Sequence, residues 1–122
     1  MKKVSVIGAT GFVGKQVVKE LSNRGYAVIA IARDTTKVEQ TRNVTTVSGD
    51  VNNVEELSKI LEGSDAVINT FNPGWTNPNL YDDFLNGSKN IEKAVENKKN
   101  LDLKEILDQL NQIDFTDTSN QF

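Results

Sequence analysis

Residues 4–14 have the sequence VSVIGATGFVG, and this stretch decides the fold. The apolar run at 4–7 predicts a buried strand, and the spaced glycines after it predict a tight turn that leads into a helix. Glycine lets the backbone approach a ligand closely, and a helix start offers unpaired N–H groups at the positive end of its dipole. These features suit a phosphate, so the motif predicts a nucleotide pyrophosphate as the ligand.

The composition limits the classes of function. The chain has 122 residues, which is typical of one domain, and a formal net charge of −3, which gives no electrostatic case for nucleic acid binding. It contains no cysteine and no histidine, so disulfides are excluded and the commonest metal ligand and general base are missing. We expect no metal site. Without a long apolar stretch or a convincing signal peptide, we expect a cytoplasmic protein that does not enter a membrane.

The pattern along the chain predicts an α/β fold. Strands are expected at about 3–7, 26–32, 44–48 and 65–71, and three of these four runs are continuously apolar, as in strands buried on both faces of a parallel sheet. Segments with helical spacing separate them. We therefore predict a Rossmann-like, doubly wound parallel sheet of about four strands in the order 3-2-1-4, with helices on both faces.

Capping signals mark where these helices begin and end. Gly25 and Gly63 read as helix stops, and Asn53 with Glu56 reads as a capping box. The polar segment 97–100 predicts a break before a second amphipathic helix at 102–114, whose apolar stripe reaches Ile113. We therefore divide the chain into a dinucleotide-binding domain at 1–97 and an atypical C-terminal helix with a frayed tail at 98–122.

The segment VIGATGFVG at 6–14 resembles the NmrA-like, NAD(P)H-binding branch of the atypical extended short-chain dehydrogenases/reductases, which includes flavin reductases. The resemblance covers about residues 2–96. Further motifs in the expected order support it, namely Ala32-Arg33-Asp34, Gly49-Asp50-Val51 and Asp65-Ala66-Val67-Ile68. It implies a dinucleotide cofactor and an unidentified small-molecule substrate as partners.

The glycine turn and the end of the second strand supply the first cofactor contacts. Backbone N–H groups from Thr10 to Val13 would hold the pyrophosphate. An Arg after the second strand suits the 2′-phosphate of NADP, so Arg33 predicts that NADP(H) is preferred, with Lys37 as a second charge. The alternative is an exposed Arg33 paired with Asp34, and Asp34 also keeps NAD(H) possible. The predicted residues here are Gly8, Thr10, Gly11, Phe12, Val13, Gly14, Arg33 and Lys37.

The ends of the third and fourth strands supply the other contacts. The resemblance implies that Asp50 and Val51 border the adenine, and the alternative makes Asp50 an acid at a helix start. Thr70 and Phe71 would pass beside the ribose and nicotinamide, and the alternative is strand-end packing. The loop at 72–75, with the only Trp, Trp75, would either shape a substrate pocket or anchor the loop to the sheet.

The resemblance implies hydride transfer from NAD(P)H to a flavin or a small carbonyl. The Tyr-x-x-x-Lys pair of the wider superfamily is missing, because Ala30 follows Tyr26 and Leu85 follows Tyr81 at that spacing. We assign no catalytic residue. Family domains also continue with a fifth strand, which the polar segment after Glu96 replaces. A non-catalytic dinucleotide-binding or redox-sensing module, or a truncated inactive fragment, therefore remains as an alternative to an enzyme.

The predicted strand order leaves the fourth strand at an edge of the sheet. An apolar edge strand is a pairing hazard unless it is covered. We expect either that the 102–114 helix packs near this edge or that two chains associate as a homodimer.

Overall fold

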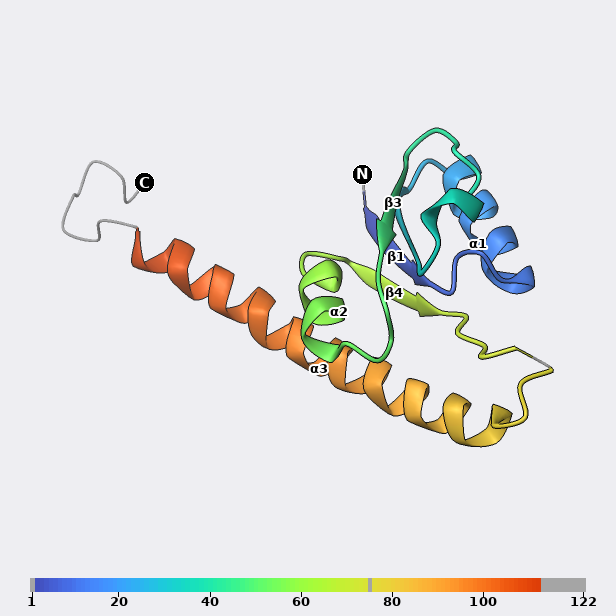
Figure 1. Ribbon diagram of the computed structural model, residues 1–122. Coiled ribbons are helices and arrows are strands. Elements are labelled where there is room, and N and C mark those ends of the chain that lie inside the picture. The colour runs from blue at the N-terminus through green and yellow to red at the C-terminus, as the bar shows by residue number, and fades with distance from the viewer. Residues whose placement is uncertain (1, 75, 113–122) are drawn as a thin grey trace, which may run out of the picture.

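The computed structural model describes residues 2–74 and 76–112. All four strands are parallel and lie in the order β3-β2-β1-β4 (Figure 1). This confirms the predicted α/β sheet and its strand order. The elements are β1 (Lys3–Ile7), α1 (Phe12–Asn23), β2 (Ala27–Ala32), the 3-10 turn η1 (Thr35–Lys37), β3 (Val44–Ser48), α2 (Val54–Leu61), β4 (Ala66–Asn69) and α3 (Leu80–Asn111). Strands β2 and β4 are shorter than predicted.

Helices lie on the two faces of the sheet (Figure 1), and an apolar cluster fills the space on each face. On one face, Val18 of α1 packs with Val6 and Val28. On the other face, Leu57 of α2 and Ile91 of α3 pack with residues that include Ile31. Consecutive residues of β1 and β2 thus enter different clusters, which explains why these strands are apolar without alternation. Helices lie on both faces, as predicted.

The ends of α1 and α2 follow their sequence signals. Gly25 and Gly63 have φ angles of +85° and +80°, which an L side chain rarely adopts, and they follow the C-terminal caps of the two helices. The Asn53 side chain accepts a hydrogen bond from the Glu56 N–H at 3.1 Å and so caps α2. Its amide also donates to the Glu56 carboxylate at 3.2 Å, so the return contact runs to the side chain of Asn53 and not to its backbone.

Helix α3 corrects the prediction of two helices with a break at 97–100, because it runs without interruption from Leu80 to Asn111. Asp102 lies within this helix, four residues after Lys98. Its carboxylate accepts hydrogen bonds from the Lys98 ammonium, one turn earlier, and from the Gly63 N–H at 2.9 Å. The polar residues at 97–100 therefore form part of a helix surface, where Asn and Lys are tolerated.

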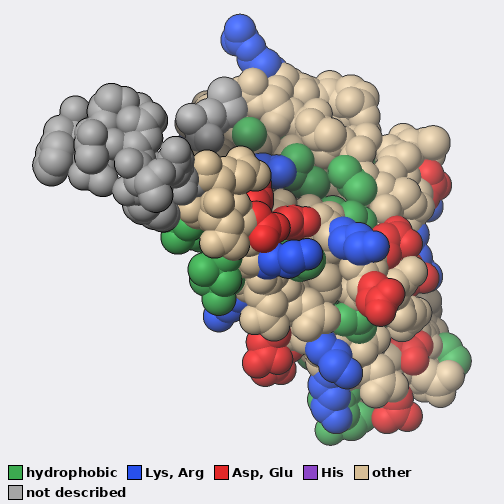
Figure 2. Space-filling model, turned by 90° about the vertical axis from the view of Figure 1, so that its left-hand side faces the viewer, with side chains coloured by type: hydrophobic (Ala, Val, Ile, Leu, Met, Phe, Trp, Pro, Cys, Tyr) green, Lys and Arg blue, Asp and Glu red, His purple; other side chains and the backbone are tan. Residues whose placement is uncertain are grey.

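The C-terminal part of α3 extends beyond the sheet (Figure 1). Its apolar side chains are about half exposed, so this face of the helix does not cover β4. Figure 2 views the molecule from that side and shows apolar side chains at its surface. The exposed fractions are 55% for Leu103, 54% for Ile106, 51% for Leu107 and 45% for Leu110. The predictions for Trp75, Ile113 and the frayed tail lie outside the described residues.

Candidate functional site

A cavity of about 360 Å³ lies at the carboxyl ends of the strands. It sits where β1 has β2 on one side and β4 on the other, which is the position where open parallel sheets bind ligands. The structure brings eight of the predicted site residues to it. They are Gly8, Thr10, Gly11, Arg33, Asp50, Val51, Thr70 and Phe71.

The three glycines of the turn have different tasks. Gly8 has a φ of +81°, and a Cβ there would lie 2.9 Å from the Thr70 carbonyl oxygen. A Cβ on Gly14 would lie 2.0 Å from the Gly8 oxygen, so α1 packs directly on the turn. A Cβ on Gly11 would meet only the Gly8 oxygen, at 3.4 Å. Gly8 and Gly14 are thus required by packing, whereas Gly11 leaves open a space that belongs to the cavity.

The start of α1 is suited to an anion. Gly11 is the N-cap and supplies no side-chain cap, and the first turn contains no acidic residue. The first N–H groups of a helix have no partner within the helix, which leaves those of Phe12 and Val13 available. The Gly11 N–H donates to the Gly8 oxygen at 3.1 Å, so this one of the predicted donors from Thr10 to Val13 is already engaged within the turn.

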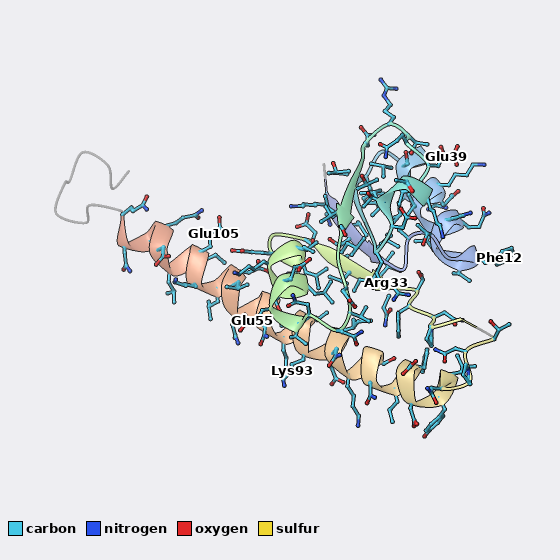
Figure 3. All side chains as sticks on the ribbon, viewed as in Figure 1. Phe12, Arg33, Glu39, Glu55, Lys93 and Glu105 are labelled. Atoms are coloured by element: carbon cyan, nitrogen blue, oxygen red, sulfur yellow. The ribbon has the colours of Figure 1, made fainter. Side chains whose placement is uncertain are left out.

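Three residues predicted at the glycine turn, Phe12, Val13 and Gly14, do not line the cavity. Phe12 is 89% exposed and projects away from the sheet (Figure 3), and Val13 is also exposed. Gly14 is buried under the turn. Any contact that these residues make with a ligand in the cavity comes from the backbone.

Arg33 follows β2 and its exposed side chain lines the cavity (Figure 3). The two ion pairs of the described residues are Arg24–Glu20 and Lys98–Asp102, so the predicted alternative, an Arg33–Asp34 pair, is not seen. Asp34 accepts from the Thr36 hydroxyl at 2.5 Å and from the Thr36 N–H at 3.0 Å. The Thr36 hydroxyl, and then its N–H, hold the pKa of Asp34 below its ordinary value.

Lys37 is not brought to Arg33. It lines a second hollow of about 220 Å³ between α1 and η1, together with Lys15 and Lys19. Because Lys37 ends η1, the turn carries it to the α1 face of the sheet. Arg33 and Lys37 are four positions apart in the sequence, but the backbone between them directs their side chains to different hollows.

The ends of β3 and β4 show both local and cavity roles. The Asp50 carboxylate accepts from the Asn52 N–H at 2.9 Å, in the turn before Asn53, which is the N-cap of α2, and Asp50 also lines the cavity beside Val51. The Thr70 hydroxyl donates to the Ile7 oxygen at 2.7 Å and so ties β4 to β1 at the glycine turn. The role of this hydroxyl is therefore the predicted alternative, which is to pack the end of the strand.

Phe71 packs between the end of β4 and α3 and lines the cavity together with residues of α3. Its ring is stacked on Phe84, with centroids 6.4 Å apart and an interplanar angle of 14°. A Cβ on Gly87 would lie 2.2 Å from the Phe71 ring, so the absence of a side chain at Gly87 lets α3 approach this strand end. Phe71 thus packs the strand end and also lines the cavity.

A polar group of residues beyond β4 also lines the cavity, and only one of its members, Asn72, lies in the loop at 72–75 for which a substrate pocket was predicted. These residues lie in the loop that follows the strand and in the first turns of α3. The signal for them was the Asn-rich loop directly after a strand end, together with the i, i+3 spacing of two polar residues at the start of α3. The group consists of Asn72, Asn77, Asp83 and Asn86.

The described residues limit two other classes of site. In the ranges 2–74 and 76–112, no group of three or more acidic, histidine or cysteine residues could hold a metal ion. Over the same part of the chain, no helix combines the length and the apolar character that crossing a membrane requires.

Comparison with known proteins gives consistent matches. A family model described as NAD(P)H-binding matches residues 8–106. The oxidoreductase ylbE from Lactococcus lactis has a TM-score of 0.71 and 37% identity, over 80% of this chain and 44% of that one. The Bordetella bronchiseptica enzyme WbmH, solved in complex with NAD+, has a TM-score of 0.67 and 25% identity, over 81% of this chain and 36% of that one.

A curated relative adds a sequence match. The sterol-4-alpha-carboxylate 3-dehydrogenase (decarboxylating) of Dictyostelium discoideum is 36% identical over 70 residues, which are 56% of this chain and 21% of that protein. The chain thus spans less than half the length of each of these three proteins.

Proposed function

This chain belongs to the NAD(P)H-binding family, and from that premise we propose that the cavity at its strand ends binds NADP(H) in preference to NAD(H). The observation that carries the proposal is the uncapped start of α1 at Gly11, on the same cavity as Arg33. The donor set fits the group. The N–H groups of Phe12 and Val13 would hold the pyrophosphate, and Gly11 leaves room for it.

Arg33 is the basis for the NADP(H) preference. Its guanidinium is exposed, lines the cavity and has no carboxylate partner within the described residues. A planar guanidinium can bind a phosphate through two N–H groups, which suits the 2′-phosphate of NADP. Asp34 accepts both hydrogen bonds from Thr36 at Oδ1, which leaves Oδ2 as the atom that would accept from the ribose hydroxyls if NAD(H) bound instead.

The remaining contacts follow the strand order. Asp50 and Val51, after β3, would border the adenine. Thr70 and Phe71, after β4, would border the ribose and nicotinamide. The hydroxyl of Thr70 would act indirectly, because its proton already goes to the Ile7 oxygen and holds the turn in place.

For the reaction, we propose hydride transfer from NAD(P)H to a flavin or a small carbonyl. The bound cofactor would supply the hydride, and a proton from solvent would complete the reduction of the acceptor. The task of this chain is then to orient the cofactor and to hold the acceptor against it. A non-catalytic binding module is the second candidate; NmrA-like proteins often lack the Tyr-x-x-x-Lys pair, so its absence here does not decide between the two.

Calorimetric titration with NADPH and with NADH tests the binding proposal. We expect NADPH to bind more tightly, and Arg33→Asp to reverse the preference, because the carboxylate repels the 2′-phosphate and accepts from ribose hydroxyls. Gly11→Asp should abolish binding of both, since it places a negative side chain in the pyrophosphate space. An unchanged preference in Arg33→Asp would remove the 2′-phosphate role.

NADPH oxidation with added flavin tests the reaction. Turnover well above that of Gly11→Asp supports an enzyme. Binding without turnover supports the non-catalytic module.

A further inference from the structure

The polar end of the cavity has a chemical character of its own. We call the four residues Asn72, Asn77, Asp83 and Asn86 the amide wall. They lie beyond β4, on the side of the cavity opposite the adenine contacts proposed after β3. Asp83 carries the only charge of this wall, and the other charged residues that line the cavity, Arg33 and Asp50, follow β2 and β3.

Packing fixes the position of Asp83 and Asn86. They are three residues apart in α3 and so share one face of the helix. The neighbouring positions Phe84 and Gly87 pack against the Phe71 ring at the end of β4. Because this contact anchors the first turns of α3 to the sheet, Asp83 and Asn86 project from a rigid element and not from the loop.

The hydrogen bonds within the amide wall show which groups remain available. The Asn77 amide donates to Asp83 Oδ2 at 2.8 Å, and its oxygen accepts from the Asn79 N–H. The oxygen of Asn72 accepts from the Gly74 N–H at 2.8 Å, which leaves its amide hydrogens. Among the described residues, neither Asp83 Oδ1 nor the Asn86 amide has a side-chain partner.

From this arrangement we propose that the amide wall holds the acceptor substrate, and that this substrate is a neutral or cationic molecule with adjacent hydroxyl or amino groups. Asp83 Oδ1 accepts from one such group, and the Asn86 amide both donates to and accepts from the next. A carboxylate accepts hydrogen bonds and donates none, so it favours donors in the ligand and repels anions.

This inference rests on the proposed function, because the wall faces the nicotinamide end only if the cofactor lies along the strand ends as proposed. It also narrows that function. A carbonyl compound that carries hydroxyl groups fits the wall, whereas a keto acid does not, because its carboxylate would meet Asp83.

The test uses the full chain, labelled with ¹⁵N, and amide chemical shifts of residues 83–87 in the presence of NADP+. Three probes differ in charge while each carries hydroxyl groups: serinol is cationic, erythritol is neutral and tartrate is a dianion. We expect serinol and erythritol to shift these amides, and tartrate to shift them least. Asp83→Asn should weaken serinol binding about fivefold, since the neutral amide keeps the Asn77 contact and loses the charge.

Asp82→Asn is the matched control. Asp82 is an acidic residue in the same first turn of α3, and it does not line the cavity. Equal effects of the two substitutions, shifts that tartrate produces as strongly as serinol, or no shifts at 83–87 with any probe would each overturn the proposal.

The same experiment distinguishes failure of the proposed function from failure of the amide-wall proposal. If NADP+ leaves the glycine-turn amides unshifted, cofactor binding fails, and the three probes are then compared on the cofactor-free chain with the same criteria for the amide wall.

Discussion

The β1-α1-β2 unit at 3–32 and the end of α3 at 98–111 both carry apolar patterns, but only the first is buried. In the first unit, Val6 and Val28 lie in the core, and Gly14 lets α1 pack on the turn. In the second, the apolar stripe of α3 stays about half exposed. Amphipathic spacing therefore predicts the helix in both regions, whereas burial depends on what lies opposite. For 3–32, the neighbouring strands supply that opposite surface.

The largest expected effect on stability comes from a substitution that disrupts the packing of the β1-α1-β2 unit. Gly14→Ala places a Cβ 2.0 Å from the Gly8 oxygen, and a backbone atom cannot move aside without shifting α1 from the turn. We expect the free energy of unfolding to fall by about 3 kcal/mol, measured by urea denaturation followed by circular dichroism.

Gly11→Ala is the control for Gly14→Ala. Its Cβ meets only the Gly8 oxygen, at 3.4 Å, so the fold should lose less than about 1 kcal/mol. NADPH affinity should nevertheless fall, because the methyl group enters the cavity. Similar losses of stability in the two variants would show that Gly14 is not required by packing any more than Gly11 is.

The next effect concerns the first turns of α3. These turns are anchored to the sheet, whereas the end of the helix is not. Gly87→Ala places a Cβ 2.2 Å from the Phe71 ring, which must leave its stack on Phe84. We expect a loss of about 2 kcal/mol in unfolding free energy, together with altered shifts at the amide wall. Ser88→Ala, at the next position of the same helix, serves as the comparison. A loss in Gly87→Ala no larger than in that variant would show that the Phe71 ring does not anchor α3.

The same contrast explains what the sequence could predict. The strand order, the glycine turn and eight cavity residues follow from short signals that the parallel sheet brings together at one edge. The continuity of α3 did not follow, because a polar segment such as 97–100 fits a loop or a helix surface equally well. The position of Lys37 depends on the path of the η1 turn, and that of the amide wall depends on where α3 docks against the end of β4, neither of which side-chain spacing encodes.

A smaller effect concerns Asp102, the contact between the end of α3 and the rest of the fold. The hydrogen bond from Lys98, and then that from the Gly63 N–H, lower the pKa of Asp102. Its folded pKa thus lies below its unfolded value of about 3.9, so its contribution is present above that pH and is lost as the pH falls through the folded pKa.

Asp102→Asn tests this contribution. At pH 7 we expect a loss of about 0.5 kcal/mol, because the pair is partly exposed to solvent. The difference in unfolding free energy between this variant and the unmodified chain should shrink as the pH falls below about 4. Urea denaturation at each pH measures this difference. A difference that stays constant with pH would show that the charge of Asp102 does not contribute.

The smallest expected effect concerns the exposed stripe itself. Replacing its four apolar side chains with Gln should change the unfolding free energy by less than about 1 kcal/mol, since these side chains already contact water. Ile91→Ala, in the buried part of the same helix, should cost about 3 kcal/mol. The four substitutions are Leu103→Gln, Ile106→Gln, Leu107→Gln and Leu110→Gln.

The two variants together decide whether burial differs along α3 in solution. If the fourfold variant loses as much stability as Ile91→Ala, the stripe is covered in solution, and the contrast between the two regions fails. Sedimentation of the same chains also tests the association predicted from the β4 edge. Loss of a faster-sedimenting species in the fourfold variant would locate that contact on α3. If the species persists, β4 is the surface that associates, because its backbone pairing groups face outward at the edge of the sheet.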